Sequence, residues 1–389
     1  MIKRIILPAL ALAMAATACA ADLDSLCRAV AVKSPSLRTE RANADAERLQ
    51  GEVDNSLAGP EVDFDYKFNH NGGENRWGVS VGQAFDWPGV YAARGKSNRL
   101  RSGAFEQLYR QNVIDKALEL KLAAIRLAQA RENLKIITEA HDNFTALAAS
   151  LKRSYDRGEA TILALRKSEL QLMAVRTSLV DAESELAAAE AALEAVEPGC
   201  LADFKAVVGL EIKPLQAREV YEAAMASSPG MDGRRIEAEA VRNDISVARR
   251  AALPSFKLSY AHDYEDGTHF NGFGIGISLP SWQPRKAVRL AEARAVAAEF
   301  GVTDYGIVLK ARLSADYSEA ARLYSRISDE REVLAGDYPA LLKKAYEAGI
   351  FTVFEYLTEY NSYLDTIAAH NALLARYATL EASLAKYLD

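Results

Sequence analysis

The sequence has few of the residue patterns on which enzymes depend. Only five of its 389 residues are histidine, and they show neither HExxH nor His-x-His spacing. A Gly-rich phosphate loop is missing, and no Ser or Cys stands in a nucleophile motif. We therefore expect a protein without catalysis, cofactor or resident metal. The histidines are His70, His141, His262, His269 and His370.

The sequence also lacks an excess of positive charge. It has 47 Lys and Arg residues and 53 Asp and Glu residues, which leaves a net charge of −6 and predicts no nucleic-acid partner.

Proline is missing from residues 90–154 and again from 285–336. Compact domains need more such breaks, so we expect long helices and an elongated chain.

Beyond the N-terminus there is no run of about 18 apolar residues that could cross a bilayer as a helix. Residues 1–20 have a basic start, an apolar run and small residues, which is typical of a secretory signal peptide. Cleavage before Ala21 competes with cleavage before Cys19 and lipidation of that cysteine. The first is favoured because Ala16 replaces the usual Leu of a lipoprotein signal.

Two cysteines, Cys27 and Cys200, remain in the exported chain. An even pair in an oxidising compartment can form a disulfide, and two buried thiols are the equal alternative.

The chain contains two copies of one unit. A constant offset of 194 positions aligns Pro35 with Pro229, Pro60 with Pro254 and Tyr66 with Tyr260. We therefore divide the mature chain into a first repeat, 21–199, and a second, 200–389.

Each repeat opens with a helical segment, at about 23–57 and 215–252, and continues into a β-hairpin, at 61–86 and 255–280. Apolar and polar residues alternate along the strands, with His70, His262 and His269 expected in the strand turns. A small soluble sheet is one interpretation. The aromatic residues Trp77, Trp87, Tyr91 and Trp282 favour membrane strands instead. Because four strands cannot close a barrel, it must then be shared between chains.

A long helical hairpin follows each β-hairpin. The two reversals, at 155–161 and 346–352, share the pattern Tyr-x-x-Gly-x-x-Thr. We expect Gly158 and Gly349 to leave the first helix with positive φ, and Thr161 and Thr352 to cap the return helix.

These features together resemble the TolC-like outer-membrane efflux proteins, or outer membrane factors, and within them the heavy-metal-cation branch. The resemblance rests on the twin repeats, on "VGQAFDWPGVYAARGKSN" and "GIGISLPSWQPRKAVRLAEARA" after the strands, on "FKAVVGL" between the halves and on the two reversals. It implies a mainly α fold with β, in which long antiparallel hairpins form an α-barrel and four strands per chain contribute to a twelve-stranded trimeric β-barrel.

The resemblance further implies a homotrimer that sits in outer-membrane lipid and extends into the periplasm of a Gram-negative bacterium. Such a channel passively conducts substrates, metal cations or drugs, as the exit duct of a tripartite efflux pump. Its helical tips meet a periplasmic adaptor (membrane fusion protein) and, through it, an inner-membrane transporter. The matching docking positions are Tyr155, Arg157, Gly158, Thr161, Tyr346, Gly349 and Thr352.

Two details depart from the family pattern. Glu159 occupies a tip position where apolar residues are common, so docking there differs in chemistry. Glu355 matches one position of an acidic pore constriction, whereas Thr358 stands where the family has Asp, with Glu359 beside it. We expect Arg157 and Tyr346 to face the adaptor and to contribute little to the barrel. A solvated surface carboxylate is the alternative for Glu355.

Two other functions remain open at this point. An outer-membrane duct of a type I protein secretion system would share the whole architecture. A non-channel periplasmic coiled-coil adaptor has one long hairpin with β-rich flanks, whereas this chain has two hairpins.

Overall fold

The computed structural model describes residues 23–70, 75–204, 214, 217–279, 283–334 and 336–387. The chain divides into two compact units, and each contains segments of both sequence repeats. The helical unit comprises the chain up to Leu37, Asn112–Ala226 and the chain from Lys310 onward. The sheet unit comprises Arg38–Gln111 and Ser227–Leu309.

Each repeat opens with two helices where the sequence predicted one. The first repeat has α1 (Leu23–Ala31) and α2 (Pro35–Asp54), and the second has α5 (Ala217–Ser227) and α6 (Pro229–Ala251). In both repeats a proline begins the second helix. Proline lacks the N–H that would continue the preceding helix, and its ring is accepted in a first helical turn. The prediction of unbroken segments at 23–57 and 215–252 was therefore wrong.

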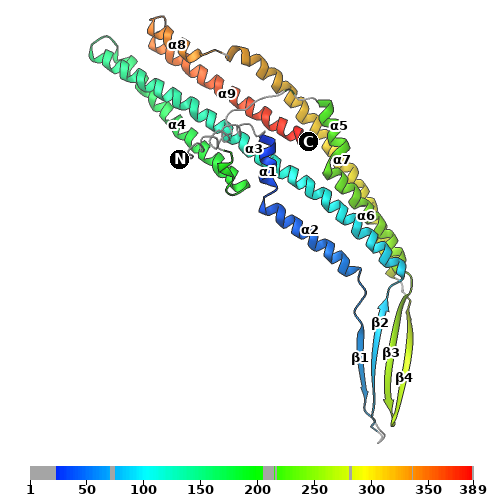
Figure 1. Cartoon of the computed structure of the whole chain (residues 1–389). Coiled ribbons are helices and arrows are strands. Elements are labelled where there is room, and N and C mark those ends of the chain that lie inside the picture. The colour runs from blue at the N-terminus through cyan, green and yellow to red at the C-terminus, as the bar shows by residue number, and fades with distance from the viewer. Residues whose placement is uncertain are drawn as a thin grey trace, which may run out of the picture. The chain divides into compact units, whose positions relative to one another are not determined.

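The four strands form one antiparallel sheet in chain order, as Figure 1 shows. They are β1 (Glu61–Lys67), β2 (Arg76–Phe85), β3 (Ser255–Glu265) and β4 (Thr268–Ser278). The predicted hairpins β1–β2 and β3–β4 are confirmed, and β2 pairs with β3 to join them. The combination of long helices with a four-stranded sheet is thus the fold that the sequence predicted.

The second β-hairpin is longer than the sequence suggested. We expected residues 262–269 to form a loop, but β3 and β4 extend through it and leave only Asp266 and Gly267 as the turn. Their φ angles are 46° and 74°, the left-handed conformation that tight hairpin turns require at both central positions. The Asp-Gly pair was the overlooked signal. His262 and His269 consequently lie in strands, and their placement in a turn was wrong.

The rest of the described chain consists mainly of long helices. The first helical hairpin consists of α3 (Pro88–Asp156) and α4 (Ile162–Val196), and a short 3₁₀ turn, η1 (Cys200–Ala202), follows. The second consists of α7 (Gln283–Leu334), α8 (Tyr338–Glu347) and α9 (Val353–Ala385). With 69 residues, α3 extends for about 100 Å at about 1.5 Å per residue.

Two apolar cores stabilise the helical unit. One contains Cys27 of α1, Leu120 and Leu127 of α3, Leu193 of α4 and Phe204. The other lies beside the helical reversals and contains Phe144, Leu151, Leu165, Leu342, Leu357 and the tyrosines Tyr356 and Tyr360. Because both helical hairpins contribute to the second core, it fixes the two reversals side by side.

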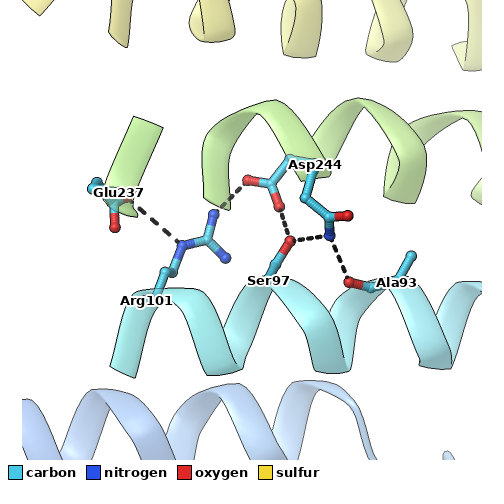
Figure 2. A network of polar contacts seen from close by, with 6 residues as sticks. Ala93, Ser97, Arg101, Glu237 and Asp244 are labelled. Atoms are coloured by element: carbon cyan, nitrogen blue, oxygen red, sulfur yellow. Dashed lines mark hydrogen bonds and ion pairs between the residues drawn. The ribbon is translucent and has the colours of Figure 1, made fainter. Parts of the chain in front are cut away.

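The helices of the sheet unit are joined by a polar network, drawn in Figure 2. Asp244 of α6 accepts a hydrogen bond of 2.7 Å from the Ser97 hydroxyl and forms an ion pair with Arg101, both on α3. The neighbouring Asn243 amide donates to the Ala93 carbonyl and to Ser97 Oγ, each at 2.9 Å. Satisfied polar groups of this kind fix the register of one helix against the other.

None of the helices among the described residues is both long enough and apolar enough to span a membrane.

Candidate functional site

The two helical reversals, called here tip 1 (Tyr155–Thr161) and tip 2 (Tyr346–Thr352), have the same backbone. Gly158 and Gly349 adopt φ of 75° and 73°. In tip 1 the Glu159 N–H donates to Ser154 O at 2.8 Å and the Gly158 N–H donates to Tyr155 O at 2.8 Å. The equivalent bonds of tip 2 are 2.9 and 3.0 Å long. This is the Schellman ending of a helix, and the predicted role of both glycines is confirmed.

Threonine begins the return helix in both tips, as predicted. Thr161 Oγ1 accepts from the Ala164 N–H at 3.2 Å, and Thr352 Oγ1 accepts from the Glu355 N–H at 3.3 Å. Only tip 2 has the reciprocal bond, from the Thr352 N–H to Glu355 Oε2 at 2.8 Å, which completes a capping box.

Polar contacts tie the two helical hairpins together near the tips. The Asn143 amide of α3 donates to the Tyr356 hydroxyl of α9 at 2.7 Å. The side-chain amides of Gln171 in α4 and Asn361 in α9 exchange hydrogen bonds of 2.7 and 3.1 Å. Figure 1 shows the two tips at the same end of the helical unit. The two tips therefore form one composite surface.

Tip 1 presents charged and exposed side chains. Arg157 donates to Glu159 Oε2 from Nε at 2.9 Å and from Nη2 at 2.6 Å, and to Ser154 Oγ at 3.2 Å. The hydrogen bond from Arg157 lowers the pKa of Glu159, so that carboxylate stays ionised at neutral pH. Tyr155 is 39% exposed. The prediction that Arg157 is available on the surface agrees with its half-exposed side chain.

Tip 2 is aromatic and apolar. Tyr346 is half-buried and packs on Tyr356, with ring centroids 5.1 Å apart. Burial raises the pKa of the Tyr346 hydroxyl. Tyr346 therefore has a packing role within the chain, because its ring covers the core beside the tips, and its contact with an adaptor stays a prediction. Ile350, one residue past the glycine, is the exposed apolar side chain.

The two candidate constriction residues have local partners. Glu355 forms the capping box with Thr352, and the hydrogen bond from the Thr352 backbone N–H, followed by that from its hydroxyl, lowers the pKa of the Glu355 carboxyl. The Tyr338 hydroxyl donates to Glu359 Oε2 at 3.4 Å. Both carboxylates are exposed. The acidic ring stays a prediction, and capping explains Glu355 within one chain.

Cys27 and Cys200 lie in the same apolar core of the helical unit, and both are thiols in this structure. Burial raises the pKa of the Cys200 thiol, which makes it a poor nucleophile. The disulfide stays a prediction. Cys19 and the signal peptide, 1–20, lie outside the described residues.

The sheet has one apolar and one polar face. On the apolar face most of the large side chains are exposed, among them Phe273 at 85% and Ile275 at 78%. Alternation places the following residues on this face: Val62, Phe64, Tyr66, Trp77, Val79, Val81, Leu258, Tyr260, Phe273, Ile275 and Ile277. An exposed apolar surface of this kind marks contact with another molecule or a membrane.

The opposite face is polar and rich in glycine. Lys257 of β3 reaches across β2 to Glu61 of β1, with Nζ and Oε2 at 2.6 Å. This path crosses Gly82, where an added Cβ would lie 2.5 Å from Lys257 Cε. Arg76 and Glu265 form a second ion pair at 3.1 Å. Glycine in β2 thus allows long charged side chains to lie flat on this face.

Two further features were missed in the sequence. The tyrosines Tyr356, Tyr360 and Tyr363 recur at helical spacing on α9, and the first two are buried in the core beside the tips. Their i, i+4, i+7 pattern was a readable signal. An exposed apolar stripe also follows α4, at Leu163, Leu170, Met173 and Val180. Its heptad-like spacing is typical of helix-to-helix contact.

Part of the chain matches a known protein family in sequence. Residues 26–196 match the model of the family described as outer membrane efflux protein. The matched stretch lies within the first repeat, 21–199. No curated protein matches the sequence at a significant level.

Solved structures match nearly the whole chain. VceC, an outer membrane protein of Vibrio cholerae, is 17% identical over 95% of this chain and 96% of its own, with a TM-score of 0.76. The CmeC outer membrane channel of Campylobacter jejuni is 15% identical over 95% and 85%, with a TM-score of 0.72. CusC, studied for folding and transmembrane channel formation, is 18% identical over 94% and 91%, with a TM-score of 0.71. The chain therefore has the fold of these outer-membrane proteins, and its residues 26–196 carry the sequence pattern of the outer membrane efflux protein family.

Proposed function

We propose that this protein is an outer-membrane channel in which three copies of the chain enclose one passage, and that it is the exit duct of a tripartite efflux pump. The observation that carries this proposal is the sheet, which exposes an apolar face and has a polar opposite face. A strand that spans a membrane turns alternate residues toward lipid and toward an aqueous interior, which gives this pattern.

The edges of the sheet explain why more than one copy is needed. In the described chain, β1 and β4 each pair with one strand only. Unpaired backbone N–H and C=O groups are too costly in lipid, so β4 of one copy would pair with β1 of the next until the ring closes. The glycine-rich polar face then lines the interior.

The helices support the same assembly. Exposed apolar side chains follow α4 in the helical unit and α7 in the sheet unit, where Leu290, Phe300 and Ile307 are exposed. Helices of a monomer would turn such side chains inward. Neighbouring copies would cover both stripes and extend the passage into the periplasm as an α-barrel.

Assembly is tested by measuring the mass of the untagged, detergent-extracted protein by native mass spectrometry and by cross-linking. We expect three chains. A stable monomer that remains folded in detergent would contradict the shared barrel.

Membrane insertion is tested with one substitution on each sheet face. Ile275→Arg places a charge on the apolar face and should cost about 2–4 kcal/mol near the bilayer midplane. Ser278→Arg is the control on the polar face of the same strand. We expect the first variant to be depleted from the outer membrane and the second to be retained. Equal retention would show that the apolar face does not meet lipid.

Orientation is tested with epitope tags in intact cells. A tag at Gly267, in the β3–β4 turn, should be labelled from outside, whereas a tag at Glu159 in tip 1 should be labelled only after the outer membrane is opened. Gly72 offers a second outer position but lies outside the described residues. Labelling of tip 1 on intact cells would invert the arrangement.

The tips are the proposed contact for a periplasmic adaptor, which links the channel to an inner-membrane transporter. Arg157→Asp should preserve the trimer and abolish efflux, because it replaces the exposed cation of tip 1 and repels Glu159. Arg48→Asp in α2 is the matched control, since Arg48 forms a similar exposed pair with Glu52 at 2.6 Å. If Arg157→Asp supports full efflux at normal trimer yield, the tips are turns without a docking role.

We further propose that the exported substrates are heavy-metal cations, on the strength of the resemblance described for the sequence. Cells that lack the protein should become sensitive to divalent metal salts and keep their resistance to hydrophobic drugs. The opposite pattern would assign the channel to a drug pump and leave the duct itself intact.

A further inference from the structure

Two histidines lie together on the apolar face of the sheet, close to the β3–β4 turn. His262 of β3 pairs with Asn271 of β4, and Tyr264 pairs with His269. His262 and His269 are therefore diagonal neighbours across one strand pair, on the same face. His262 is half-buried and His269 is exposed.

Their ring nitrogens are separated by a distance that suits chelation. His269 Nδ1 lies 3.2 Å from His262 Nε2. Two nitrogens bound to one ion at about 2.05 Å stand about 2.9 Å apart in square-planar geometry and about 3.3 Å apart in tetrahedral geometry.

A hydrogen bond to Asn271 leaves the Nε2 of His262 unprotonated. Asn271 Oδ1 accepts from His262 Nδ1–H at 2.7 Å and from the Tyr260 hydroxyl at 2.9 Å. With its proton held at Nδ1, His262 presents an unprotonated Nε2 toward His269. Histidine ligands of metal sites are oriented by this kind of hydrogen bond to a carbonyl oxygen.

We propose that His262 and His269 form a binding site for a divalent transition-metal cation of the imidazole-preferring class, Cu²⁺, Zn²⁺ or Ni²⁺. In the unbound pair the His269 Nδ1–H donates to His262 Nε2. On binding, this proton leaves Nδ1 and the other ring nitrogen of His269 is protonated through solvent, so the pair keeps its net charge. Within the described residues, no group of three or more His, Cys, Asp or Glu side chains forms a metal site. In this proposal the two imidazoles are the protein ligands, and water would fill the other coordination positions.

Trp77 is a built-in reporter for this site. Its ring centroid lies 5.7 Å from that of His262 and 5.9 Å from that of Tyr264. Cu²⁺ quenches tryptophan fluorescence at short range, whereas Zn²⁺ does not. Binding of Cu²⁺ beside His262 should therefore give a saturable loss of Trp77 emission.

The experiment titrates Cu²⁺ into the full-length, untagged protein in detergent. We expect a saturable quenching phase with one Cu²⁺ per chain, reversed by excess Zn²⁺. His262→Gln and His269→Gln should each remove that phase, and His141→Gln, a substitution on α3, should retain it. Trp77→Phe should abolish the quenching while equilibrium dialysis still finds the bound ion. Asn271→Ala should weaken binding about 10–100-fold, because it removes the acceptor that orients His262.

Trimer mass and circular dichroism, measured for each variant, show that the loss of the phase is not a loss of fold. Equal Cu²⁺ affinity in His262→Gln, His269→Gln and the unchanged protein would overturn the site, as would quenching that never saturates. Either result would leave the pair as a simple hydrogen bond between strands.

Discussion

Tip 1 and tip 2 have the same backbone and different surfaces. Both end a helix with a left-handed glycine and begin the next with a threonine cap. Tip 1 then presents the exposed Arg157–Glu159 ion pair, whereas tip 2 covers an aromatic core with Tyr346 and presents Ile350. The glycine and the threonine of the shared pattern define the turn, and the other residues of each tip define its surface.

This difference implies a division of roles. The aromatic side of tip 2 fixes the two helical hairpins together, because Tyr356 lies in the core that both hairpins share and accepts a hydrogen bond from Asn143. The helices on either side of tip 1 contribute Leu151 and Leu165 to that core, but the turn residues Arg157 and Glu159 remain exposed. An adaptor that docks here would meet a charged patch beside an apolar one.

The largest effect on stability is expected for the aromatic core beside tip 2. Tyr356 is 2% exposed, so Tyr356→Ala should destabilise the tip region by about 3–5 kcal/mol through the cavity it leaves. Tyr155→Ala in tip 1 should change stability by less than about 0.5 kcal/mol, because that side chain is largely outside the core. Hydrogen exchange of the amides in residues 353–360 measures both. Equal losses would show that the tips are packed alike.

A smaller, equal effect is expected for the two glycines. An added Cβ at Gly158 or Gly349 meets nothing within 4 Å, so only the positive φ opposes alanine. Each Gly→Ala substitution should cost about 1–2 kcal/mol, and each Gly→Asn substitution less, since asparagine tolerates this conformation better. Exchange at residues 154–159 and 345–350 gives the two values. A clear inequality would mean that the two turns differ in more than their surfaces.

The two N-cap threonines should contribute differently to the stability of the two tips. Thr161→Ala removes one side-chain hydrogen bond and should cost about 1 kcal/mol. Thr352→Ala should cost more, because the hydroxyl also donates to Glu355 Oε2 at 2.8 Å and helps to hold the capping box. Thr→Ser at each position is the control that keeps the cap. If the two alanine variants lose equal protection at the start of the return helix, the capping box adds nothing.

The smallest effect is expected from acid and salt. The pKa values of Glu159 and Glu355 are both lowered in the folded chain, by Arg157 and by Thr352 respectively. Each carboxylate therefore contributes stability that is present above the usual Glu pKa of about 4.3 and is lost as pH falls through the lowered value. Amide protection in both tips should decrease below about pH 4.

Salt should distinguish the two carboxylates. The Debye length falls to about 3 Å at 1 M ionic strength, which screens the exposed Arg157–Glu159 pair, whereas the capping box of Glu355 has neutral donors. At neutral pH, 1 M salt should lower protection in tip 1 and leave tip 2 nearly unchanged. Equal sensitivity of both tips would contradict the assignment of partners.

Parts of the fold followed from local patterns. Alternation in residues 61–68 and 272–279 predicted the strands, and the long stretches without proline predicted α3 and α7. The Tyr-x-x-Gly-x-x-Thr pattern predicted both reversals with their glycine and threonine roles. These features depend on the backbone preferences of a few adjacent residues, which a sequence displays directly.

Other parts depended on partners far along the chain. Tyr346 packs inward because the ring of Tyr356 on the return helix lies against it, whereas Tyr155 at the equivalent position of tip 1 is 39% exposed. The pair Asp266 and Gly267 was the sequence signal that β3 and β4 extend to a two-residue turn. The prediction of a longer polar loop missed this signal.

The sequence by itself determined the two repeats, the alternation of the strands and the turns at the tips, because each is set by local backbone geometry and by the side-chain period of one element. Only the tertiary structure decided that the two β-hairpins join through β2 and β3, that both tips share one core, and that His262 and His269 meet. Packing between segments that are distant in sequence depends on side-chain shape and register, which no local pattern specifies.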